Sequence, residues 1–163
     1  MKPYKKIIVF FLLFLSSTIL VGQSKKEKEY LATKELIKSK KFVFDGKLLI
    51  PYNSSSIVIT GDGLLVEGNK IYVNLPYVGN SFKGVMGESS TLEFLSFQEK
   101  LNIKYNDKKR KILIKFQETI KGESFTFFLT IRGNKKTEIK VLCSSRSSIV
   151  YRGKVKKMII KRY

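Results

Sequence analysis

The sequence has no histidine and no tryptophan, and it has only one cysteine among its 163 residues. Without histidine there is no imidazole base to activate a serine or cysteine nucleophile, and no imidazole ligand for a metal ion. One cysteine excludes an intramolecular disulfide and a thiolate zinc site. Nothing in the spacing of the acidic residues brings together the two carboxylates that glycosidic chemistry needs. We therefore expect that the protein is not an enzyme and has no cofactor.

The one long apolar run lies near the N-terminus. Lys2, Lys5 and Lys6 precede the apolar residues 7–21, and GQS then separates this run from the charged stretch KKEKE. This is the order of a secretory signal peptide, and the run is shorter than the roughly 20 residues of a transmembrane helix. We expect residues 1–23 to be removed as a signal peptide, which predicts a periplasmic or secreted protein. The alternative is an uncleaved N-terminal anchor.

Acidic residues are also few. Without the three leader lysines the chain has 29 Lys and Arg against 13 Asp and Glu, a formal charge of +16. We favour a compositional origin, because lysine far exceeds arginine and no helix or loop concentrates the charge as a nucleic-acid motif would. The alternative is a polyanion-binding surface that includes the basic C-terminal tail. The candidate residues for it are Lys154, Lys156, Lys157, Lys161 and Arg162.

A change of periodicity divides the mature chain into a helix and a β-domain. Residues 24–40 contain good helix formers, and their apolar positions fall roughly on one side of a helix. These positions are Tyr30, Leu31, Ala32, Leu36 and Ile37. From Phe42 onward apolar and polar residues alternate, as in the stretch 125–131, which is typical of antiparallel strands with one buried face. Residues 41–163 are therefore expected to form a single β-domain.

Turn residues punctuate the alternating segments at short intervals. Asp62-Gly63, Gly68-Asn69 and Gly133-Asn134 are examples of dipeptides that suit tight connections between strands. Short connections favour strands that pair in chain order, so we expect a meander of roughly eight antiparallel strands that rolls into a barrel. An open sheet curled over the helix is the alternative. Cys143 shares its strand parity with Ile139 and Val141, so it is expected to be a small buried hydrophobe.

The motif LPYVG follows the strand-like run KIYVN. Pro76 has no N–H to give to a β-ladder, and Gly79 allows the backbone to turn. Pro76 therefore belongs at a strand end or an edge. The motif predicts that the strand from Lys70 to Leu75 leaves the sheet here and that Tyr77 is free to pack across the corner.

The order of these segments resembles that of a known family. A helix, the strand KFVF, the run GLLVEGNKIYVNLPYVG, a β-rich middle and a closing SSIVYRGKV are similar to the domain of unknown function 4251 (DUF4251) family of small exported proteins, typical of Bacteroidetes. The similarity extends from about residue 34 to residue 155. The residues that match the family's motifs are Leu75, Pro76, Tyr77 and Gly79, with Tyr151 and Gly153 of a closing Tyr-x-Gly. The resemblance implies export and a β-barrel of lipocalin-type topology. It assigns no activity and no functional residue.

Two kinds of binding remain open from the sequence. The first is an exported, non-catalytic β-domain that binds a small apolar ligand or an envelope protein, because small barrels can hold one ligand and aromatic residues could line the site. For residues such as Phe125 and Phe127, however, a filled core is the preferred interpretation. The second is the polyanion-binding protein that uses its lysine-rich surface.

Overall fold

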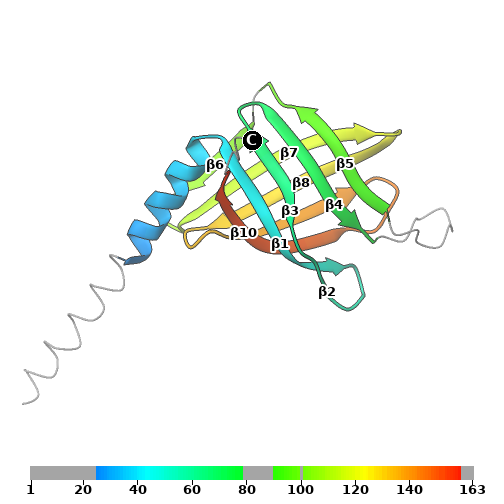
Figure 1. Ribbon diagram of the computed structural model, residues 1–163, viewed down its shortest axis with the longest axis horizontal. Helices are drawn as coiled ribbons and strands as arrows, with labels where there is room; N and C mark the ends of the chain where they lie inside the picture. Colours follow the sequence, from blue (N-terminus) through cyan, green and yellow to red (C-terminus); the bar gives the residue numbers. More distant parts are fainter. Residues whose placement is uncertain (1–24, 79–89, 100, 159–163) are drawn as a thin grey trace, which may run out of the picture.

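The computed structural model describes residues 25–78, 90–99 and 101–158, which form one helix and a ten-stranded antiparallel sheet (Figure 1). The helix covers residues 25–38, within the expected range. The strands are β1 (Lys41–Pro51), β2 (Ile57–Val58), β3 (Asp62–Glu67), β4 (Lys70–Tyr77), β5 (Ser90–Phe97), β6 (Asn102–Asn106), β7 (Lys111–Ile120), β8 (Glu123–Arg132), β9 (Lys136–Cys143) and β10 (Ile149–Lys157). An all-β antiparallel domain with one N-terminal helix is thus confirmed.

The sheet consists of two arms that meet at the first and last strands. Its order is β5-β4-β3-β1-β10-β9-β8-β7-β6, and β2 pairs with β1 beside this path. Within each arm the neighbours follow chain order, as expected for a meander. The arms are joined by the pairing of β1 with β10, which connects residues 98 or more positions apart. The sheet curls into a half-barrel whose two edges are β5 and β6, so the predicted barrel has one open side (Figure 1).

Alternating side chains fill the inside of the half-barrel. On β8, Phe125, Phe127, Leu129 and Ile131 are all buried, and the residues between them face outward. Phe127 stacks on Phe116 of β7 with 4.5 Å between ring centroids, and it contacts Phe94 of β5 at 5.8 Å. The contact between Phe127 and Phe94 connects the two arms across the interior. The preferred prediction, that Phe125 and Phe127 belong to a packed core, is confirmed.

The helix lies against one end of the half-barrel (Figure 1). Its buried residues are Tyr30, Thr33 and Ile37, which recur at the i, i+3, i+7 spacing of one helical face. The sequence-based prediction also placed Leu31 and Ala32 on the buried side, and this is wrong, because both side chains are exposed. A polar residue, Thr33, takes the central buried position.

The LPYVG motif ends its strand later than predicted. β4 continues through Tyr77, which pairs with Ser90 of β5, so the strand does not stop at Leu75. Pairing of β4 with β3 ends at Val73, however, so Pro76 lies beyond the last contact with that neighbour. A proline at such a strand edge costs no ladder bond on that side. Gly79 lies outside the described residues.

Candidate anion-binding groove

A groove of about 740 Å³ crosses the outer face of the sheet over β1, β10, β9 and β8. Charged and polar side chains line it, together with Leu48 and Gly153. The charged residues in its lining are Lys47, Arg132, Lys136, Arg152 and Lys154, together with the acidic residues Asp45 and Glu138. The groove therefore has five cationic and two anionic side chains, and its formal charge is positive.

Strand register brings these residues together from distant parts of the chain. Lys154 of β10 lies opposite Asp45 of β1 and opposite Lys136 of β9. In the next outward row Arg152 lies between Leu48 and Glu138. Residues directly opposite each other in antiparallel strands project from the same face of the sheet. The groove is thus a product of three strand pairings, and of no single sequence segment.

The junction of β1 with β10 also shapes the groove. The register shifts between Gly46 and Leu48, so Lys47 is the extra residue of a β-bulge, and bulges bend the strand that contains them. Gly46 lies opposite Gly153, which also lines the groove. A Cβ atom on Gly153 would lie 2.1 Å from the backbone oxygen of Asp45. The two strands can therefore approach this closely only because residue 153 has no side chain.

Two of the five cations are neutralised by neighbouring carboxylates. Lys47 Nζ lies 3.1 Å from Asp45 Oδ1, and Arg152 Nε donates to Glu138 Oε2 at 3.0 Å. For Arg132, Lys136 and Lys154, no ion pair forms with any side chain of the described residues. Three cations within one groove repel one another, and an anionic ligand would relieve that repulsion.

The basic residues expected from the C-terminal sequence are divided by the structure. Lys154 lies in the groove. Lys156 and Lys157 follow on β10 opposite Val43 and Phe42, and both are exposed. Lys161 and Arg162 lie outside the described residues. The sequence did not predict the four other groove cations, which are Lys47, Arg132, Lys136 and Arg152. Their outward parity was visible in the sequence, but the pairing that gathers them was not.

The two family motifs meet inside the half-barrel. Tyr151 donates its hydroxyl hydrogen to the carbonyl oxygen of Pro76 at 2.8 Å, and Tyr77 donates to the carbonyl oxygen of Ser147 at 2.8 Å. Both phenols are buried, and burial raises the pKa of Tyr151 and of Tyr77 above the ordinary value, so both remain hydrogen-bond donors. Leu75 is buried beside them. These motif residues therefore stabilise the fold.

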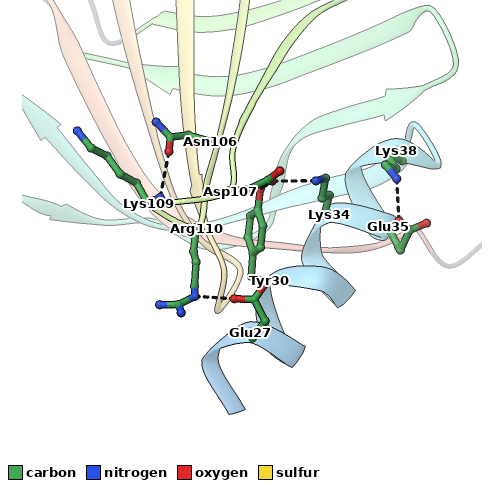
Figure 2. Close-up of polar contacts among 9 residues, drawn as sticks. All are labelled: Glu27, Tyr30, Lys34, Glu35, Lys38, Asn106, Asp107, Lys109 and Arg110. Atoms are coloured by element: carbon green, nitrogen blue, oxygen red, sulfur yellow. Dashed lines mark hydrogen bonds and ion pairs between the residues drawn. The ribbon is translucent and has the colours of Figure 1, made fainter. Parts of the chain in front are cut away.

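A polar cluster anchors the helix to the β6–β7 turn. Asp107 of that turn accepts a hydrogen bond from the Tyr30 hydroxyl at 2.5 Å and one from Lys34 Nζ at 2.8 Å, and these side chains point toward one another (Figure 2). Arg110 Nε donates to Glu27 at 2.9 Å, one helical turn earlier. On the β8–β9 turn the carbonyl of Gly133 accepts from Thr33. Hydrogen bonds from Lys34 and then Tyr30 lower the pKa of Asp107, so this carboxylate is stabilised in its charged form.

The lowered pKa of Asp107 predicts how stability depends on pH. The folded state favours the ionised carboxylate of Asp107. The stability that this carboxylate contributes is therefore fully present above its pKa in the unfolded chain, near 4. This stability is lost as the pH falls through the lower pKa of the folded state. We expect Asp107→Asn to be less stable than wild type at neutral pH, and the gap to narrow at about pH 3. Thermal unfolding at both pH values measures this. A gap that does not change with pH would contradict the role of the ionised carboxylate.

Cys143 was predicted to be a small buried hydrophobe; it packs against the core but is only partly buried. It is the last residue of β9, and its Sγ lies 3.5 Å from Ser145 Oγ. Across the described ranges, no group of three or more acidic or cysteine side chains is placed to hold a metal ion. The same part of the chain has no helix that is both long enough and apolar enough to span a membrane.

Comparisons with known proteins place this chain in a family. No curated protein matches it. A crystal structure of a DUF4251 family protein from Bacteroides eggerthii is similar in fold, with a TM-score of 0.58 and 15% sequence identity, and the match covers 83% of this chain and 91% of that one. The model of the domain of unknown function DUF4251 matches residues 24–155. The chain therefore belongs to the DUF4251 family.

Proposed function

We propose that this protein is an exported, non-catalytic binding domain that holds an anionic ligand in the outer groove. The observation that supports this most is the set of three cations, Arg132, Lys136 and Lys154, which line one groove without a carboxylate partner among the described residues. A positively charged cleft raises the local concentration of anions and increases their association rate. Export is inferred from the sequence of residues 1–23, which lie outside the described part of the chain.

An apolar ligand inside the half-barrel, or an envelope protein as partner, is the other possibility that the sequence suggests. The aromatic side chains that could line such a site contact one another, with Phe116 and Phe127 stacked in parallel and Tyr77 packed edge-on against Phe125. Contacts of this kind are those of a packed core. The groove, in contrast, is open to solvent and has three cations that form no ion pair within the described part of the chain, so we propose that the ligand binds there.

The proposal predicts a salt-dependent affinity for a polyanion that depends on groove cations. We expect Lys136→Gln/Lys154→Gln to bind heparin about tenfold more weakly at low salt, because each contact to an anionic group releases a counterion. The slope of log affinity against log salt should fall by about one to two units. Isothermal titration calorimetry at several sodium chloride concentrations measures both quantities.

A matched control removes the same net charge elsewhere. Lys25 and Lys28 are exposed on the first turns of the helix, so Lys25→Gln/Lys28→Gln lowers the total charge by the same amount. If the groove is the binding site, this control keeps nearly the wild-type affinity and slope. Equal losses in both double variants would mean that heparin responds to overall charge alone, and the proposed site would be wrong.

A further inference from the structure

A small apolar projection borders the cationic groove. β2 and the turn before it extend beyond the body of the sheet (Figure 1). Their large apolar side chains face solvent, with Val58 76% exposed, Tyr52 65% and Ile57 42%. Val58 lies opposite Leu48 of β1, and Leu48 in turn lies opposite Arg152 of β10. Because opposite residues share a face, Val58, Leu48 and Arg152 form one row that runs from the apolar projection into the groove. Ile57 lies opposite the buried Leu49, so its side chain projects from the other side of the hairpin.

We propose that the groove and β2 together dock the protein on an anionic lipid bilayer, an inference that rests on the anion-binding function proposed above. The groove cations would face the phosphates of the headgroups. The protruding hairpin, with Val58 on the groove side, Ile57 on the other side and Tyr52 in the turn, would enter the boundary between headgroups and acyl chains. Stable attachment of a peripheral protein needs two such signals, one apolar and one electrostatic. Here the two signals are adjacent on neighbouring strands.

The layout of the surface fits a bilayer better than a soluble polyanion. A soluble acidic polymer offers no apolar environment for Val58 and Ile57, so these side chains would remain exposed to water when it binds. A bilayer presents anionic groups and hydrocarbon at adjacent depths, and basic residues near its surface are attracted to acidic lipids. Because the apolar residues lie on a protruding hairpin, they can enter the boundary while the body of the sheet stays in water.

The absence of tryptophan from the chain allows a direct test of insertion. The variant Val58→Trp places a single indole on β2. The protein is produced with its own leader and purified after export, so that residues 1–23 do not contribute to lipid binding. With vesicles of phosphatidylcholine and phosphatidylglycerol we expect the Val58→Trp emission to shift to the blue and to be quenched by brominated acyl chains. With phosphatidylcholine alone we expect no shift.

A control and a second variant separate this inference from the proposed function. Leu95 is half exposed on edge strand β5, so Leu95→Trp should show no shift with the same vesicles. We expect Ile57→Ser/Val58→Ser to bind the anionic vesicles at least about tenfold more weakly than wild type, while its affinity for heparin stays within about twofold.

Each contrary result contradicts one identifiable claim. If the anionic vesicles bind but the Val58→Trp emission does not move, or if the serine variant binds them as wild type does, docking through β2 is wrong and the anion-binding groove stands. The same holds if heparin binds and vesicles do not. If Lys136→Gln/Lys154→Gln binds both heparin and vesicles as tightly as wild type, the proposed function itself fails, and this inference fails with it.

Discussion

Replacing Gly153 by alanine is expected to lower the free energy of unfolding by about 3 kcal/mol or more, the upper range for forcing extra atoms into a packed site. The added Cβ would lie 2.1 Å from the carbonyl oxygen of Asp45 and 2.9 Å from the ring of Phe44. A backbone atom of a paired strand cannot rotate away as a side chain can. β1 and β10 would therefore have to separate where they join the two arms of the sheet.

The cross-strand partner of Gly153 provides the control. Gly46 lies opposite it, and a Cβ there would first meet the terminal methyl carbon of Ile59 at 2.9 Å, an atom at the flexible end of a side chain. We expect Gly46→Ala to cost less than about 1 kcal/mol, since a side-chain terminus can shift. Urea unfolding followed by circular dichroism measures both variants. Similar losses in the two would show that the close approach at Gly153 does not limit the fold.

The second large effect is expected at Tyr151, the other residue of the closing family motif. Its hydroxyl is buried and donates to the carbonyl oxygen of Pro76 at 2.8 Å. Tyr151→Phe keeps the ring but leaves that carbonyl without its donor, which costs about 2 kcal/mol for a buried acceptor. This hydrogen bond also joins β10 to β4, two strands that are not neighbours in the sheet. Its loss should therefore weaken the contact between the arms.

An exposed tyrosine is the matched control for this substitution. Tyr72 donates its hydroxyl hydrogen to Glu93 at 2.8 Å on the outer face. Because water can replace the lost hydroxyl as a donor to Glu93 on this exposed face, Tyr72→Phe should change the free energy of unfolding by no more than about 0.5 kcal/mol. If Tyr151→Phe proves as stable as Tyr72→Phe, the buried bond between the motifs contributes little, and the structural role assigned to the motif is wrong.

The sequence predicts best what local periodicity determines. The alternation of apolar and polar residues predicted strand β8 with Phe125 and Phe127 on its buried face. This works because successive side chains of a strand point to opposite faces whatever its neighbours are. The helix was also predicted correctly, but Leu31 is 50% exposed and not buried as expected. Only the surface onto which the helix docks decides which part of its apolar stripe is buried. Cys143 had the predicted parity but is only partly buried, because it ends its strand and lies beyond Val141, the last residue of β9 that pairs with β10.

Long-range pairing lies beyond what one sequence indicates. The join between β1 and β10 depends on a bulge and on closure of the half-barrel, and neither has a distinctive local pattern. It also depends on Gly153, which the sequence indicated as a motif residue without its partner strand. The groove shares this limit. Lys154 was noted as part of a basic tail, but its neighbours Lys136 and Arg132 come from β9 and β8, and only the register brings them together. Charge that looked evenly scattered along the chain is concentrated by the fold.

The central claim, that the outer groove binds anions, is tested most directly by locating the ligand. Backbone amide signals of the exported protein, recorded by NMR during titration with a short heparin oligosaccharide, report which residues it contacts. We predict that the largest shifts fall on Arg132, Lys136 and Lys154, and that the exposed lysines of the helix and the residues of β5 move little. Saturable shifts on the helix or on β5, with the groove signals unmoved, would contradict the proposed function.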